Sequence, residues 1–126
     1  MRIEGLHHVA IIASDYARSK RFYVEVLGLR VVAEHYRAER DSWKLDLALP
    51  DGSQIELFSF PASPPRASYP EALGLRHLAF EVEDMTAFAG HSAALGFPIA
   101  AAGTIGYEML TGLGLRYERI YLEGED

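Results

Sequence analysis

Short stretches in the first half of the chain are apolar or alternate between apolar and polar residues, which is typical of β-strands. Four of them are separated by turn residues: 5–13, 30–36, 43–49 and 54–60. Between the first two, Ser14 and Asp15 can cap a helix whose apolar residues recur at helical spacing, and Gly28 can end it. The pattern therefore predicts the order strand, helix, strand, strand, strand.

Alternation along a strand also predicts which side chains share a face. It places His8 with Ala10 and Ile12 in the first strand. In the last strand it places Glu56 on the face of Phe58 and Phe60. In the strand before it, the apolar residues Trp43, Leu45, Leu47 and Leu49 lie opposite Lys44, Asp46 and Ala48. Trp43 is compatible with the core or with the wall of a binding site.

The beginning of this pattern occurs twice. Residues 6–11 and 75–80 both have the order Leu, any residue, His, aliphatic, Ala, apolar, and an Asp and a Leu-Gly pair follow each copy at nearly the same offsets. We interpret this as a duplicated module. The repeat also separates two adjacent histidines, because His8 corresponds to His77 whereas His7 has no histidine counterpart.

The second copy follows a proline-rich linker. It begins with a predicted strand at 76–82 and a helix capped by Asp84 and ended by Gly96. If the modules match, three more strands follow, which we place at 98–103, 107–110 and 115–122. The predicted fold is α+β, a single domain of two βαβββ modules (1–60 and 75–126) joined by a linker at 61–74. Modules of roughly 60 residues are marginal alone, so they should share a core or pair across a dimer.

Composition limits the possible functions. The chain has no cysteine, which excludes disulfides, thiolate catalysis and cysteine-ligated zinc. We find neither a signal-peptide pattern nor an apolar run of about 18 residues, so we expect a cytoplasmic protein without a membrane partner. A net charge of −6, with no extended run of Lys and Arg, disfavours binding to nucleic acid.

The chemistry centres on Glu56 and the two repeated histidines. A carboxylate buried beside aromatic residues is costly unless something compensates its charge, and a divalent metal would do so. Histidine and carboxylate ligands suit Zn, Ni, Co, Mn or Fe(II). A pseudo-twofold relation between the modules would bring His8 and His77 to equivalent places. We therefore predict a metal site with His8, Glu56 and His77, against the alternatives of structural histidines and a solvent-facing glutamate.

The fourth ligand has two candidates in the sequence. Glu118 follows a glycine turn and would lie in the middle of the last strand, which favours it. Glu123 lies at the end of that strand, at a spacing from His77 closer to that of the first module. We take Glu118 as the ligand and keep Glu123, or no fourth ligand, as alternatives.

One basic cluster accompanies these residues, formed by Arg37, Arg40 and Lys44. We expect these side chains to form a solvated edge. Binding of an anionic substrate is the alternative.

Together, these residues resemble the vicinal oxygen chelate superfamily, which includes glyoxalase I, fosfomycin-resistance proteins, methylmalonyl-CoA epimerase, extradiol dioxygenases and bleomycin-resistance proteins. The segments that carry the resemblance are 8–11, 22–23, 27–29, 54–58 and 76–80, with Asp15. A narrower similarity, at 40–44 and 56–61, is to a bacterial glyoxalase-like subgroup. The resemblance implies a curved mixed β-sheet around a divalent metal, and a homodimer. It also implies metal ligands at His8, Glu56, His77 and a glutamate of the last strand, although the Asp-Pro-Asp-Gly turn that usually precedes this glutamate is missing.

The resemblance implies three functions. The first is a metal-dependent lyase or isomerase of the glyoxalase I (lactoylglutathione lyase) class, which acts on a small vicinal-oxygen substrate such as a thiol hemithioacetal. A proton would leave carbon to form an enediolate, with Glu118, or alternatively Glu56, as general base. The second is a non-enzymatic small-molecule-binding or resistance protein of the bleomycin-resistance type. The third, an Fe(II) extradiol dioxygenase, is less favoured because it leaves Glu56 unexplained.

Overall fold

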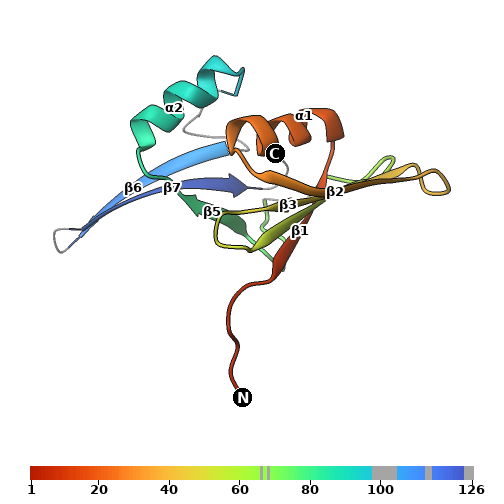
Figure 1. The fold of residues 1–126 in the computed structure, drawn as a ribbon, viewed down its shortest axis with the longest axis horizontal. Coiled ribbons are helices and arrows are strands. Elements are labelled where there is room, and N and C mark those ends of the chain that lie inside the picture. Colours follow the sequence, from red (N-terminus) through yellow and green to blue (C-terminus); the bar gives the residue numbers. More distant parts are fainter. Residues whose placement is uncertain (66, 68, 98–104, 113–114, 124–126) are drawn as a thin grey trace. The chain divides into compact units, whose positions relative to one another are not determined.

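The chain forms two compact units, Met1–Ser63 and Pro64–Asp126, whose boundary lies in the proline-rich stretch. The computed structural model describes residues 1–65, 67, 69–97, 105–112 and 115–123 (Figure 1). Both units combine helices with β-sheets, which confirms the α+β class. We describe each unit by itself.

The first unit has the βαβββ order predicted from the sequence. Its elements are β1 (His8–Ala13), α1 (Tyr16–Arg21), η1 (Phe22–Val26), β2 (Arg30–Arg37), β3 (Ser42–Ala48) and β4 (Gln54–Ser59). They form a four-stranded sheet in the order β1-β4-β3-β2. The sheet is mixed, because β1 runs parallel to β4 while the other two pairs are antiparallel. The first and last strands of the module are thus direct neighbours.

Local signals set both ends of the helical segment. The Asp15 carboxylate accepts a hydrogen bond from the backbone N–H of Arg18 at 3.1 Å, as expected of an N-cap. Gly28 has a φ of 70°, which a residue with a side chain rarely adopts, and the helix ends there. The sequence did not predict that the last turn is a π-helix, in which Leu27 N–H bonds to Phe22 O at 3.0 Å.

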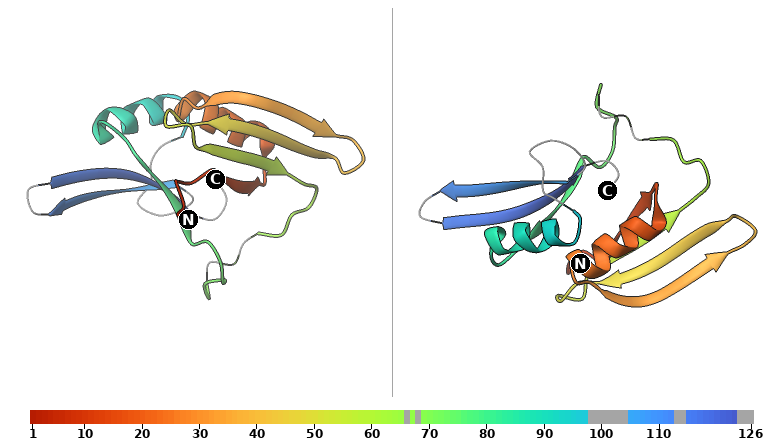
Figure 2. Two further views of the ribbon diagram at one scale, coloured as in Figure 1. Left: turned by 60° about the horizontal axis from the view of Figure 1, so that its bottom comes forward. Right: turned by 90° about the horizontal axis from the view of Figure 1, so that it is seen from above.

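The core of this unit lies between the helical segment and one face of the sheet (Figure 2). Its buried side chains include Phe22, Tyr23, Val26, Leu45, Leu47, Ile55 and Leu57. Trp43 belongs to this side, because its ring stacks on Tyr16 of α1 with centroids 5.0 Å apart. This contact answers the question that the sequence left open for Trp43.

The second unit contains β5 (His77–Glu81), α2 (Met85–Ala94), β6 (Ile105–Gly112) and β7 (Leu115–Glu123). Asp84 caps α2 as predicted, accepting from the N–H of Ala87 at 3.0 Å. The predicted strand at 98–103 lies outside the described residues, and β6 and β7 contain the other two. These strands form a sheet in the order β5-β7-β6, in which β5 is antiparallel to β7. The described pairing therefore differs from the parallel β1–β4 pair of the first unit.

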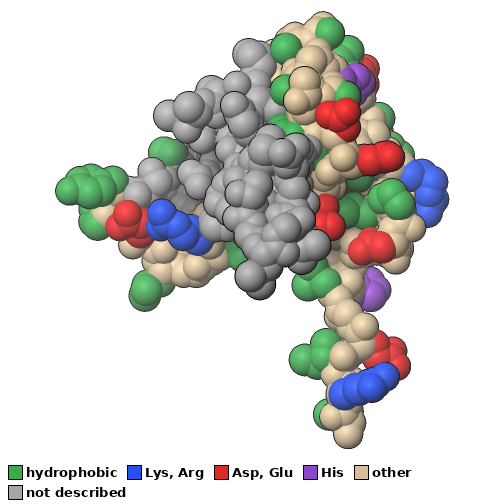
Figure 3. All heavy atoms as spheres, turned by 90° about the vertical axis from the view of Figure 1, so that its left-hand side faces the viewer, with side chains coloured by type: hydrophobic (Ala, Val, Ile, Leu, Met, Phe, Trp, Pro, Cys, Tyr) green, Lys and Arg blue, Asp and Glu red, His purple; other side chains and the backbone are tan. Residues whose placement is uncertain are grey.

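The surface that Figure 3 draws carries scattered positive and negative side chains rather than one basic patch. Among the helices of the described residues, none has the length and apolar character needed to cross a membrane.

Glu34 ties β2 to α1. Its carboxylate accepts hydrogen bonds from Lys20 Nζ, at 2.8 Å, and from the Tyr16 hydroxyl. The bond from Lys20, followed by that from Tyr16, holds the pKa of Glu34 below its ordinary value. Burial, together with the bond to Glu34, raises the pKa of Tyr16. The folded state therefore favours ionised Glu34.

Replacing Leu57 by Ala should lower the free energy of unfolding by about 2–5 kcal/mol, because this fully buried side chain would leave a cavity. Urea denaturation measures the change. Val32→Thr is the matched control on the edge strand, where the side chain is 44% exposed, and should change stability by about 0.5 kcal/mol or less. Equal losses in the two variants would contradict the described core.

Glu34→Gln should destabilise the protein at pH 7 and have a smaller effect in acid. The pKa of Glu34 is lower in the folded protein than its ordinary 4.5. Its contribution is therefore fully present above pH 4.5 and is lost as the pH falls through the folded pKa. Urea denaturation at several pH values measures this, with Glu39→Gln as a control for lost charge. A difference between wild type and Glu34→Gln that grows in acid would refute this account.

Candidate functional site

The sheet of the first unit has one face directed away from its helix, and the predicted site residues of this unit lie on it. Along β4, Ile55 and Leu57 are buried towards the core, whereas Gln54, Glu56 and Phe58 are half-buried on the opposite side. Along β1, Val9 and Ile11 are the more buried residues, and His8, Ala10 and Ile12 are exposed. The alternation predicted from the sequence is thus confirmed in both strands.

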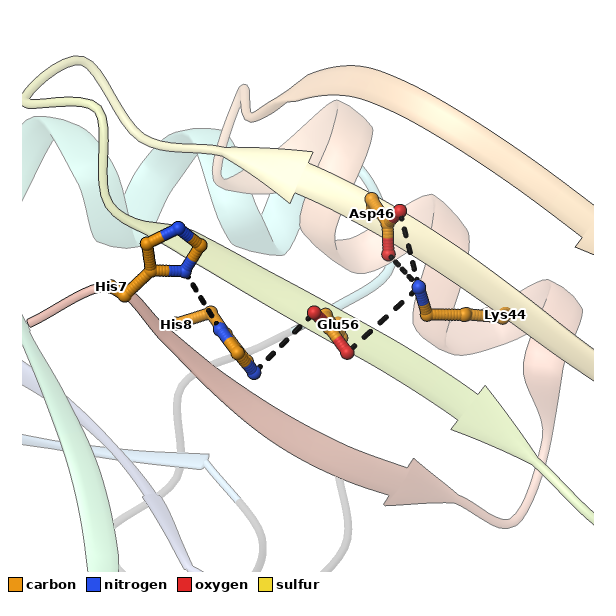
Figure 4. Close-up of polar contacts among 5 residues, drawn as sticks. All are labelled: His7, His8, Lys44, Asp46 and Glu56. Carbon is orange, nitrogen blue, oxygen red and sulfur yellow. Dashed lines mark hydrogen bonds and ion pairs between the residues drawn. The ribbon is translucent and has the colours of Figure 1, made fainter.

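The structure brings His8 and Glu56 together. In the parallel pairing of β1 and β4, Glu56 lies opposite Ala10, two positions along the strand from His8. The two side chains meet on the open face, with His8 Nε2 at 3.4 Å from Glu56 Oε2 (Figure 4). His8 is 40% and Glu56 21% exposed, so both remain accessible to a ligand.

The second ring nitrogen of His8 also has a partner. Its Nδ1 lies 2.9 Å from Nδ1 of His7, and the two rings meet edge to face (Figure 4). One of the two nitrogens must donate and the other accept. If His8 donates through Nδ1, its Nε2 keeps a free lone pair, the tautomer needed for a metal ligand. The backbone positions His7, because His7 O accepts a hydrogen bond from Gln54 N at 3.0 Å.

Two further charged residues lie beside Glu56, and the sequence did not assign them to the site. Lys44 Nζ lies 4.0 Å from Glu56 Oε1 and 3.3 Å from Asp46 Oδ1 (Figure 4). Contrary to our expectation from the sequence, Lys44 is therefore not part of a fully solvated edge. Its side chain is only 34% exposed and contacts the carboxylates of Asp46 and Glu56. Alternation showed that Lys44 and Asp46 share a face, but only the pairing of Asp46 with Glu56 places them at this site.

The His8–Glu56 pair has donors of the kind that bind a divalent cation. Two carboxylates and one ammonium leave one net negative charge when His8 is neutral. Asp46 Oδ1 is buried and makes no hydrogen bond within the described residues, so only its ion pair with Lys44 compensates it. Two donors bound to one tetrahedral zinc at about 2.1 Å lie about 3.4 Å apart, which matches the distance from His8 to Glu56. The pair thus has suitable donors at a suitable distance.

The second unit holds the other two predicted ligands. His77 begins β5 and Glu118 lies within β7, but their side chains lie outside the described part of the structure. The strand register places Glu123 opposite His77, whereas Glu118 is opposite Met109 of β6. Among the side chains described, no group of three or more His, Cys, Asp or Glu residues could hold a metal. The four-ligand set therefore stays a prediction.

Comparisons with known proteins identify the class. Residues 5–113 match the model of the Glyoxalase/Bleomycin resistance protein/Dioxygenase superfamily, and the chain belongs to this superfamily. The matched range includes His8, Glu56 and His77 and ends before Glu118.

Two bacterial relatives match the chain over about two thirds of its length. The uncharacterized protein YaeR of Escherichia coli (strain K12) is 57% identical over 89 residues, which are 71% of this chain and 69% of YaeR. The uncharacterized protein YwkD of Bacillus subtilis (strain 168) is 58% identical over 82 residues, which are 65% of this chain and 64% of YwkD.

Solved structures of other proteins have the same fold as this chain. A glyoxalase family protein from Enterococcus faecalis is 40% identical, with a TM-score of 0.71 over 92% of this chain and 87% of that one. A mutant of the fosfomycin resistance protein FosX from Listeria monocytogenes, in complex with Mn(II) and 1S,2S-dihydroxypropylphosphonic acid, has a TM-score of 0.57 at 14% identity. That likeness covers 92% of this chain and 82% of FosX, and it shows the shared fold alone.

Proposed function

We propose that the protein is a metal-dependent lyase or isomerase of the glyoxalase type, acting on a small substrate with vicinal oxygens through an enediolate. The observation that carries this proposal is the pair formed by His8 Nε2 and Glu56 Oε2 on the open face of the sheet. FosX, a protein of the same fold, is known in complex with Mn(II) and a vicinal diol, the kind of metal and substrate that we propose here. Thiol hemithioacetals are the substrates to try first.

Each residue of the first unit would have a distinct part. His8 would bind the metal through Nε2 while its Nδ1–H donates to His7. Glu56 would bind through Oε2, and its Oε1 is directed towards Lys44. A bound divalent metal would supply Lewis acidity at the vicinal oxygens. Glu118, or alternatively Glu56, would accept the proton that leaves carbon.

His77 and a carboxylate of β7 would complete the ligand set from the second unit. Glu118 is the ligand that we propose. The register at β5 also supports Glu123 as a candidate, because Glu123 is the strand partner of His77. The expected homodimer stays a prediction.

A second candidate is a non-enzymatic small-molecule-binding protein of the bleomycin-resistance type. One observation favours it specifically. The ammonium of Lys44 lies 4.0 Å from Glu56 Oε1, so this carboxylate has a counter-ion without any metal. The open face could then bind a ligand directly.

Metal binding tests the proposal. The wild type should bind about one Mn(II), Ni(II) or Zn(II) per chain by calorimetry and mass spectrometry. His8→Ala, Glu56→Gln and His77→Ala should each weaken binding by about 100-fold or more, because each removes a ligand. His35→Ala is the matched control, since it removes an exposed imidazole from the strand position opposite Lys44. Equal losses in His35→Ala and His8→Ala would reject the ligand assignment.

The same measurements separate the remaining alternatives. Loss of metal in Glu118→Gln but not in Glu123→Gln would support Glu118 as the fourth ligand, and the reverse would replace it by Glu123. Conversion of a glutathione hemithioacetal by the loaded protein would support the lyase. A wild type that binds no metal would exclude the lyase and leave the non-enzymatic candidate. Oxygen uptake on catechols by an iron-loaded protein would replace the lyase by a dioxygenase.

His7→Ala should weaken metal binding by about tenfold, because the partner that orients the His8 ring would be lost. His7→Gln keeps a hydrogen-bond acceptor and should restore part of the affinity. Nitrogen-15 NMR of the His8 ring provides a second readout, since its Nδ1–H tautomer should be less populated in His7→Ala. Unchanged affinity and tautomer would show that the contact between the two rings has no role.

A further inference from the structure

A positively charged side chain is held over an aromatic ring on the side of the sheet that carries the His8–Glu56 pair. The guanidinium of Arg40 lies 4.7 Å from the centre of the Phe60 ring. This ring stacks on Phe58, with centroids 6.0 Å apart and planes 7° from parallel. Phe58 follows Glu56 at the next position on the same side of β4, so a row of side chains leads from Glu56 to Arg40.

The turn between β2 and β3 sets the position of Arg40. Arg40 N–H donates to Arg37 O at 3.2 Å, and Asp41 N–H donates to Ala38 O at 3.2 Å. The Tyr36 hydroxyl donates to the Asp41 carboxylate at 2.7 Å. Of the two acidic neighbours of Arg40 in the chain, Asp41 is therefore already engaged by Tyr36, and Glu39 makes no ion pair with Arg40 in the described part of the structure. The backbone of the turn is held by hydrogen bonds on both sides of Arg40.

Arg40 also lacks a counter-ion in the part of the chain that the structure describes. No carboxylate there lies within 4.0 Å of its guanidinium, which is exposed to solvent. A guanidinium that stacks on a ring keeps its in-plane N–H groups free to donate, in a geometry that matches a carboxylate. The nearby Lys44 differs, because its charge is shared between Asp46 and Glu56.

We propose that Arg40, Phe58 and Phe60 form a subsite for the carboxylate end of an elongated substrate whose reacting oxygens lie at His8 and Glu56. The identity of the reacting end rests on the proposed function. Successive residues on one face of a strand are about 6.7 Å apart, so Phe60 lies about 13 Å along the strand from Glu56. The substrate is therefore a carboxylic acid whose apolar body covers the two rings, with the carboxylate at the opposite end from its vicinal oxygens.

Two probes of nearly the same shape, a carboxylate and its neutral amide, test this subsite. We would titrate the full chain with 4-phenylbutyrate and with 4-phenylbutyramide, using metal-free protein, so that a metal cannot bind the carboxylate, and then metal-loaded protein. NMR chemical shifts give both affinities. The wild type should bind the carboxylate about five- to tenfold more tightly than the amide, because of charge-assisted hydrogen bonds to Arg40.

Variants of Arg40 and Phe60 separate the contribution of charge to probe affinity from that of aromatic contact. Arg40→Gln should abolish the preference for the carboxylate while it keeps binding of the amide. Arg40→Lys should retain part of the preference. Phe60→Leu should weaken both probes to a similar extent. Arg37→Gln is the matched control, because it removes an arginine from the same hairpin, and it should keep the preference. Equal binding of the two probes by the wild type, or a preference that survives Arg40→Gln, would overturn the proposal.

The experiments distinguish failure of the Arg40 subsite from failure of the proposed function. Arg40→Gln should leave metal affinity unchanged, because Arg40 contacts the Phe60 ring, which lies about 13 Å along the strand direction from Glu56. A charge preference that depends on Arg40 in a protein that binds no metal would support the subsite and reject the lyase. Metal binding at His8 and Glu56 without any charge preference would support the lyase site and reject the subsite.

Discussion

The candidate site depends on the alternation of side chains along β4. Ile55 and Leu57 are buried against the helical layer, and their removal from water stabilises the sheet. Their burial places Glu56 on the opposite face. The parallel pairing with β1 then brings His8 to the same place. A register shift of one residue would turn Glu56 into the core, so the stability of the sheet and the geometry of the site have one cause.

The electrostatics of this face are compatible with both proposed functions. Glu56 and Asp46 lie on neighbouring strands, and Lys44 contacts both carboxylates. The remaining negative charge favours a cation, and His8 adds a nitrogen donor for a metal. The same lysine also gives Glu56 a partner when no metal is bound. The two proposed functions therefore differ in how strongly a metal cation competes with the Lys44 ammonium for the Glu56 carboxylate.

Several features follow from short-range patterns. Asp15 and Asp84 cap their helices as predicted, and Gly28 has the positive φ expected at a helix end. These signals act over a few residues, where capping and backbone preference decide. The π-helical turn at Phe22–Val26 was not predicted, because the apolar spacing of the segment indicated only a helix. The prediction that Lys44 belongs to a solvated edge was wrong for a related reason. Its contacts with Asp46 and Glu56 depend on strand register, which is a long-range property.

The sequence by itself determined the class of fold, the helix and strand order of the first module, the faces on which His8 and Glu56 lie, and the absence of cysteine chemistry. Only the tertiary structure decided the order β1-β4-β3-β2, which joins His8 to Glu56, adds Lys44, and turns Trp43 towards the helix. It also decided that β5 pairs antiparallel to β7. The physical reason is that the alternation of side chains and helix capping depend on neighbouring residues, whereas strand pairing joins segments far apart in the chain.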